Sequence, residues 1–208
     1  MCLILLLTMV KNMKTFRAFG PTLGKAKLSR KFISVINSQI EKSILTKNND
    51  YSSKLASQIK SEIKLSNFFV KKKLSKELIK NIKTYLKESE ISNIKEIKIM
   101  SLWVVRQLKS EYNPIHYHEG QLSGVGYLKI PKNMNQNKLV KNKKIKTNGT
   151  IDFINGQKNF LSKSIYNLNP KLGDLVIFPN YLMHTAYPFN VDGERRSFSF
   201  NVKILFKK

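Results

Sequence analysis

Three histidines, the only ones in this chain of 208 residues, are the side chains best suited to chemistry. His116 and His118 lie in NPIHYHEG, and His184 follows in GDLVIFPNYLMH. Residues two apart on an extended strand project from the same face, so His116 and His118 can reach one ion while Tyr117 points away. A third histidine from a distant segment would complete a facial set with open positions, which binds ferrous iron together with a cosubstrate and oxygen. The spacing therefore predicts a non-haem iron site.

Histidine also has a purely structural interpretation. A lone histidine is usually a satisfied structural residue, and an HxH pair by itself is a weak metal signal. The surrounding residues favour the metal site, because the apolar run LVIF ends at a proline and delivers His184 just after a buried strand.

The segment RRSFSFN alternates polar and apolar side chains, so Arg195, Ser197 and Ser199 share one face of a strand. A solvated outer face explains this alternation without any function. Alternatively, Arg195 binds a carboxylate bidentately and Ser197 donates a further hydrogen bond to it. A dicarboxylate such as 2-oxoglutarate would fit the second interpretation.

Together these segments carry a family resemblance. From about residue 100 to 205, Trp103 and the runs HYHEGQLSGVGYL, GTIDF, PKLGDLVIFPNYLMH and RRSFSFN resemble the 2-oxoglutarate and Fe(II)-dependent oxygenases of marine bacteria and their phages. The resemblance implies a double-stranded β-helix, which is a cupin-like jelly roll, holding Fe(II) and 2-oxoglutarate between its sheets. It implies a dioxygenase that uses O2 to hydroxylate a protein, a metabolite or a nucleic acid, with release of succinate and CO2.

Carried over residue by residue, the resemblance assigns the site residues. It implies that the metal ligands are His116, His118 and His184. It implies that the cosubstrate carboxylate is bound by Arg195 and Ser197, with Tyr127 of GVGYL against the same carboxylate.

Two positions depart from the pattern of this family. The wider superfamily has HxD or HxE where this chain has HxH, and Glu119 follows directly. Glu119 would replace His118 as a ligand only if a bulge turned it inward, since it points to the opposite face of a regular strand. Gly126 stands where similar sequences carry an aromatic residue, and we expect it to open the pocket wall or to mark a bulge.

The N-terminal half predicts helices. Apolar residues recur at helical spacing over residues 28–45 and again over residues 71–89, whereas β-branched and aromatic residues dominate from residue 96 onward. We therefore expect an α+β chain in which residues 13–95 are a helical flank and residues 96–208 are the jelly-roll core. Residues 1–12 are interpreted as an extension upstream of the natural start, at Met9 or Met13.

The opening run MCLILLLTMV is too short to span a bilayer and lacks the basic region of a secretory signal. A single cysteine, Cys2, excludes internal disulfides. These features predict a cytoplasmic protein without a membrane partner, and the resemblance implies that its host is a bacterium or a phage-infected cell.

The net charge of +25 has two interpretations. Most of the cations are lysines in a chain rich in Asn and Ile, which codon bias in an AT-rich genome would produce. A basic surface also attracts nucleic acid, and residues 131–150 carry six lysines and no acidic residue.

Two other function classes remain open from the residues alone. One is a cupin-like three-histidine iron dioxygenase that does not use 2-oxoglutarate, in which Arg195 binds the carboxylate of the substrate itself. The other is a non-catalytic jelly-roll module that binds sugars or nucleic acid.

Overall fold

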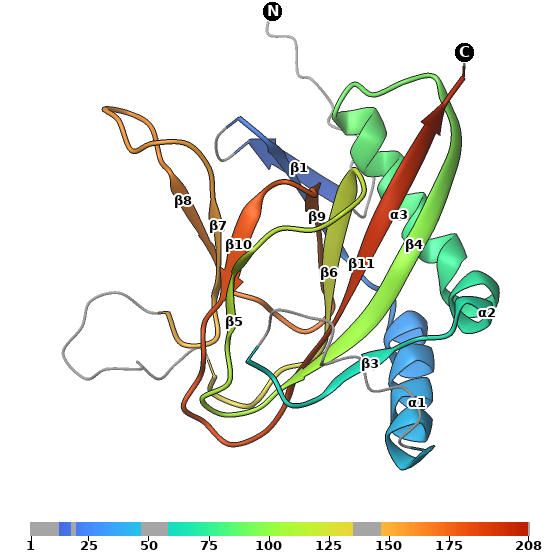
Figure 1. Cartoon of the computed structure of the whole chain (residues 1–208), viewed down its shortest axis with the longest axis vertical. Coiled ribbons are helices and arrows are strands. Elements are labelled where there is room, and N and C mark those ends of the chain that lie inside the picture. The colour runs from blue at the N-terminus through green and yellow to red at the C-terminus, as the bar shows by residue number, and fades with distance from the viewer. Residues whose placement is uncertain (1–12, 18–19, 47–57, 135–146, 208) are drawn as a thin grey trace, which may run out of the picture.

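The fold consists of two facing antiparallel sheets with helices on one outer side (Figure 1). The computed structural model describes residues 13–17, 20–46, 58–134 and 147–207. The larger sheet has the strand order β1-β2-β9-β6-β11-β4-β3 and the smaller sheet has the order β5-β10-β7-β8. This is the α+β jelly roll that the sequence predicts.

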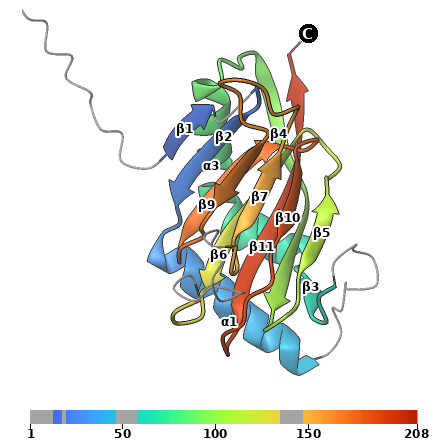
Figure 2. The ribbon, with the colours of Figure 1, turned by 90° about the vertical axis from the view of Figure 1, so that its left-hand side faces the viewer.

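The strands of the larger sheet are β1 (Met13–Arg17), β2 (Thr22–Lys27), β3 (Glu62–Lys64), β4 (Ile94–Gln107), β6 (Leu122–Lys129), β9 (Asp174–Pro179) and β11 (Arg195–Phe206). Those of the smaller sheet are β5 (Asn113–His116), β7 (Ile151–Ile154), β8 (Ile165–Leu168) and β10 (Met183–Ala186). Figure 2 looks onto the smaller sheet, with the larger sheet and the helices behind it.

The helices cover the outer face of the larger sheet. They are α1 (Arg30–Thr46), α2 (Asn67–Phe69) with the π-helical turn η2 (Val70–Leu74), and α3 (Ser75–Glu88). Their apolar stripes, predicted from the spacing, are buried against Phe198, Phe200 and Val202 of β11. Within the described residues, no helix is long and apolar enough to cross a membrane.

The expectation that residues before 96 form only a helical flank is wrong. β1 and β2 extend the larger sheet by pairing with each other and with β9, and β3 pairs with β4 at the opposite edge. The run TLGKAK of β2 contains no periodic β-branched pattern, so its strand conformation is set by its pairing with β9. The expected extension at residues 1–12 lies outside the described residues.

A second core lies between the sheets, where Tyr127, Phe153 and Phe178 are fully buried. Gly126 does not open this space, nor does it lie at a bulge. It pairs in register with Phe198, and a Cβ at Gly126 would lie 2.2 Å from Cε1 of the Phe198 ring, on the helix-covered face of the sheet. Glycine is therefore required at this position because the Phe198 ring lies directly over the strand.

Candidate metal centre and adjoining pocket

The three histidines converge beside β5 and β10 of the smaller sheet. β5 and β10 are antiparallel neighbours, and His116 is the direct cross-strand partner of His184. The ring centroids are 4.3 Å apart for this pair, 4.9 Å for His116 and His118, and 5.0 Å for His118 and His184. One nitrogen from each ring lies within 4.8 Å of the others, so the three can hold a single ion.

Backbone carbonyls orient two of these rings. His116 Nδ1 lies 2.7 Å from the carbonyl oxygen of Pro114, and His184 Nδ1 lies 2.9 Å from that of Leu182. A carbonyl only accepts, so each Nδ1 carries the proton and each Nε2 keeps its lone pair. Fixing the tautomer of a histidine in this way is the usual role of the residues behind a metal ligand.

His118 reaches the cluster from beyond the end of β5. The expectation that His116 and His118 lie on one regular strand is therefore wrong, although both side chains reach the same site. The side-chain amide of Asn180 donates to the His118 carbonyl at 3.0 Å, and the His118 amide donates to the Asn180 carbonyl at 3.0 Å. His118 Nε2 then lies 3.2 Å from His184 Nε2. Glu119 is exposed and lies outside the cluster, so no bulge replaces His118 by this carboxylate.

The surroundings keep the three imidazoles neutral. Burial lowers the pKa of His116, and burial with the proximity of His116 lowers the pKa of His118 to about 3. Burial beneath Phe153 and Phe178 lowers the pKa of His184 well below its usual value. A neutral imidazole is the form that coordinates a metal, so the site is prepared for a cation.

Arg195 lines the same pocket as the histidines, from the facing sheet. Its guanidinium donates from Nη1 to the Gly149 carbonyl at 2.8 Å and from Nη2 to Oε1 of Gln107. The Arg195 side chain is buried. Among the described residues, its Nε has no hydrogen-bond partner and no carboxylate forms an ion pair with the guanidinium. A buried cation in this state favours an anionic ligand.

Ser197 and Tyr127 are cross-strand partners on β11 and β6, and they share the inward face with Arg195. Ser197 is buried and lines the pocket. The Tyr127 hydroxyl is buried and has no hydrogen-bond partner within the described structure, and burial raises its pKa. The polar face of β11 therefore points between the sheets and is not a solvated outer surface.

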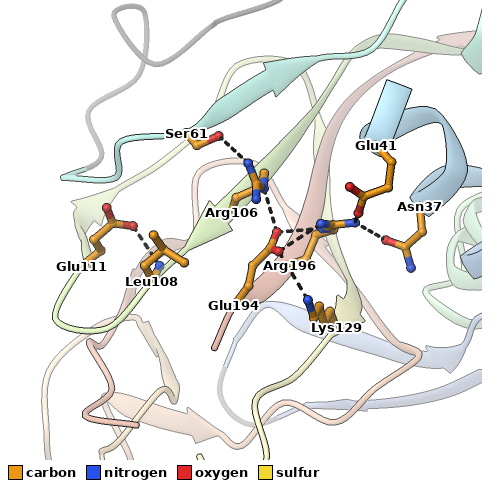
Figure 3. Close-up of polar contacts among 9 residues, drawn as sticks. All are labelled: Asn37, Glu41, Ser61, Arg106, Leu108, Glu111, Lys129, Glu194 and Arg196. Atoms are coloured by element: carbon orange, nitrogen blue, oxygen red, sulfur yellow. Dashed lines mark hydrogen bonds and ion pairs between the residues drawn. The ribbon is translucent and has the colours of Figure 1, made fainter. Parts of the chain in front are cut away.

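Arg196 points the other way, into a network on the helix-covered side (Figure 3). Its Nε donates to Glu194 at 2.7 Å, and its Nη1 donates to Glu41 at 2.8 Å and to Asn37 at 3.0 Å. Arg106 of β4 also donates to Glu194, at 2.8 Å. The two adjacent arginines thus serve different faces, as the strand alternation predicts.

The residues that hold Arg195 and His118 in place, Gln107 and Asn180, could not be identified from sequence patterns. The role of Gln107 follows from the strand register, in which Gln107 of β4 pairs directly with Arg195 of β11. Its own amide is held by the carbonyls of Glu111 and Tyr187, which fixes Oε1 toward the arginine. Asn180 lies in the PNYLMH connection, where an asparagine also indicates an ordinary turn.

Comparison with known proteins adds a family match. Residues 101–201 match the family model for 2OG-Fe(II) oxygenases. No curated protein matches the sequence of this chain.

Solved structures with the same fold share little sequence. The viral collagen prolyl hydroxylase of Paramecium bursaria Chlorella virus-1, in complex with 2OG, has a TM-score of 0.57 at 16% identity, covering 86% of this chain and 94% of its own. HygX of Streptomyces hygroscopicus, with nickel and 2-oxoglutarate bound, has a TM-score of 0.56 at 11% identity over 87% and 82%. The prolyl-4-hydroxylase of Pseudomonas putida has a TM-score of 0.54 at 10% identity over 89% and 93%.

Proposed function

We propose, from the match over residues 101–201 and the three-histidine site, that this chain is a 2OG-Fe(II) oxygenase that hydroxylates its substrate through the residues described above. The observation that carries the assignment is the pairing of two sites in one pocket. Three neutral imidazoles face a buried arginine that no carboxylate partners among the described residues.

The metal would be held by His116, His118 and His184. All three offer nitrogen, which suits Fe(II), and three protein ligands leave coordination positions open to other molecules. The set contributes no negative charge, because Glu119 is exposed. The positive charge of the ion would therefore be balanced by the anions that bind beside it.

2-Oxoglutarate would supply such an anion and would extend toward Arg195. Its far carboxylate would accept a hydrogen bond from the guanidinium Nε of Arg195. The side chains of Tyr127 and Ser197 lie on the same inward face. Two atoms of this set, Arg195 Nε and Tyr127 Oη, are buried without partners in the described part of the chain, and a carboxylate would satisfy both. Gln107 and Gly149 hold the guanidinium so that the ligand need not order it.

When bound together, Fe(II) and 2-oxoglutarate supply the oxidising chemistry, in which O2 is reduced, the keto acid is converted to succinate and CO2, and a substrate C–H bond becomes an alcohol. The chain's own contribution is to bind, orient and exclude water. Phe153, Phe178 and Trp103 surround the histidines with apolar rings, which keeps bulk water from the site.

The three-histidine dioxygenase without 2-oxoglutarate is the alternative that a direct test separates from this proposal. Fe(II) and 2-oxoglutarate are added under anaerobic conditions, absorption is recorded for the keto-acid complex, and succinate is assayed after oxygen is admitted. We expect both signals even without the primary substrate, through uncoupled turnover. Iron binding without either signal would overturn the 2-oxoglutarate assignment.

That the substrate is a nucleic acid is a prediction from the net charge of +25 alone. Most lysines of residues 131–150 fall at 135–146, outside the described residues.

A further inference from the structure

Asn113, the first residue of β5, faces the same pocket as the three histidines. On a regular strand, residues three apart point to opposite faces, so Asn113 and His116 would lie on different faces of the sheet. Between the pairs His184–His116 and Ala186–Asn113, however, β10 has one intervening residue and β5 has two. This extra residue is a β-bulge, a feature common beside active sites, and it turns Asn113 inward.

The backbone of Asn113 is held by a hydrogen bond, but its side-chain amide oxygen has no partner among the residues that the structure describes. Thr185 Oγ1 donates to the Asn113 carbonyl at 2.7 Å, which anchors the backbone to β10. Oδ1 is buried and has no hydrogen-bond partner within the described structure. Rotation of the amide by a half-turn would present its NH2 group at the same place, so this group can accept or donate there. A buried polar atom left unpaired costs free energy that a ligand can recover.

Strand register and hydrogen bonds connect Asn113 both to the metal centre and to Arg195. Its partner Ala186 is two residues beyond His184 on β10. The next residue, Tyr187, accepts a hydrogen bond from Gln107, the side chain that holds Arg195. Along the chain, Ala186, which pairs with Asn113, therefore lies between the metal ligand His184 and Tyr187, the residue bonded to Gln107.

We propose that Asn113 is a positioning residue for 2-oxoglutarate, and that its amide donates a hydrogen bond to the part of the cosubstrate between the metal and Arg195. This inference rests on the proposed function. A neutral amide suits this place because it binds an anion without adding a charge beside the three imidazoles. It would fix the keto-acid end while Arg195 fixes the far carboxylate.

The test compares Asn113→Ala, the isosteric Asn113→Asp and a matched control, Asn167→Ala. Asn167 of β8 is exposed, and its amide bonds Thr150 and Asp152. For each variant, Fe(II) affinity is measured anaerobically by equilibrium dialysis, and 2-oxoglutarate affinity by titrating the absorption of the iron complex.

We expect Asn113→Ala to weaken 2-oxoglutarate about tenfold with Fe(II) affinity unchanged, the effect of losing one hydrogen bond to a charged group. Asn113→Asp should weaken it further, because a carboxylate repels the dianion, without lowering Fe(II) affinity. Asn167→Ala should match the wild type.

Unchanged 2-oxoglutarate affinity in both Asn113 variants would overturn the assignment. So would a loss in Asn113→Ala that Fe(II) affinity follows equally, since the residue would then only support the metal site. Absence of 2-oxoglutarate binding by the wild-type iron protein is a different result, and it would overturn the proposed function itself.

Discussion

Arg195 and Arg196 are adjacent on β11 and each is only 3% exposed, yet only Arg196 has a carboxylate partner among the described residues. Arg196 is neutralised by Glu194 and Glu41 on the helix-covered side of the sheet. Arg195 faces the space between the sheets, and its partners in the described structure are two neutral groups, the Gly149 carbonyl and the Gln107 side chain. One guanidinium is therefore structural, and the other has the charge to hold an anion.

Lysine substitution at each position should separate the two roles. Lysine keeps the charge but cannot reproduce the planar fork that binds a carboxylate. Arg195→Lys should weaken 2-oxoglutarate by about 1.5–3 kcal/mol, the usual range for a hydrogen bond to a charged group. Arg196→Lys should leave this affinity unchanged, and both variants should bind Fe(II) normally. Titration of the iron complex with 2-oxoglutarate measures the difference, and a larger loss at Arg196 would refute the assignment.

The ligand assignment predicts an order of severity at two neighbouring positions. His118→Ala should lose most of its iron affinity, because His118 Nε2 lies within the cluster of metal-facing nitrogens. Glu119→Ala should keep its iron, since this carboxylate is exposed and lies outside the cluster. His184→Ala serves as the reference for complete loss of iron and activity. Iron content after anaerobic loading and desalting checks the order, and a reversed order would mean that Glu119 is the ligand.

Acid should release the iron at a lower pH than ordinary histidines would allow. Burial lowers the pKa of all three imidazoles below 6.5, so the folded protein holds them neutral at a pH where free histidine is protonated. Protons should therefore displace Fe(II) only below pH 6.5. Iron binding measured by dialysis across the acid range tests this, and a release midpoint at or above the usual histidine pKa would contradict it.

The same pKa shifts give a sign for the stability of the metal-free protein. The unfolded chain binds protons at its histidines as the pH falls through 6.5, whereas the folded chain does not. The free energy of unfolding should therefore decrease as the pH falls below that value. Urea denaturation at about pH 7.5 and about pH 5.5 measures the effect. In His184→Phe the pH dependence of the free energy of unfolding should be smaller, because one of the three histidines is absent.

Much of the site could be predicted because it depends on local spacing. The alternation in RRSFSFN determines which arginine faces inward, and the short connection after the buried strand β9 delivers His184 to β10, beside His116 of β5. The bulge in β5, which turns Asn113 inward, could not be predicted, because it is defined by the register with β10. The role of Gln107 could not be predicted either, because Arg195, the side chain that it holds, lies 88 residues away in the chain.

The helices were predictable for the same local reason, and the N-terminal strands were not. The apolar stripes of α1 and α3 recur at the helical period, so their buried faces are visible in the sequence. β1 and β2 carry no such pattern, and their conformation follows from pairing at the edge of the larger sheet, next to β9. The role of Gly126 depends on Phe198, whose ring fills the place of a Cβ, and this partner is too distant in the chain for a local pattern to indicate it.

Removing the charge of Glu194 should destabilise the fold without disturbing the pocket. Burial alone would raise the pKa of Glu194, but hydrogen bonds from Arg196 and Arg106 hold it at about 2. Because the folded pKa lies below the unfolded value, this carboxylate stabilises the fold above pH 4.5, and the contribution disappears as the pH falls toward 2. Glu194→Gln should therefore lower the free energy of unfolding at neutral pH by about 3 kcal/mol, as expected when one partner of a buried ion pair is lost.

Denaturation of Glu194→Gln and the wild type at several pH values tests this, with Glu41→Gln as the matched control. Glu41 also pairs with Arg196, but its side chain is 62% exposed, so its loss should cost less than 1 kcal/mol. The gap between Glu194→Gln and the wild type should narrow as the pH falls below 4.5, because the wild-type carboxylate is then protonated as well. A gap that is independent of pH would mean that Glu194 acts through packing, because only a charge contribution disappears on protonation.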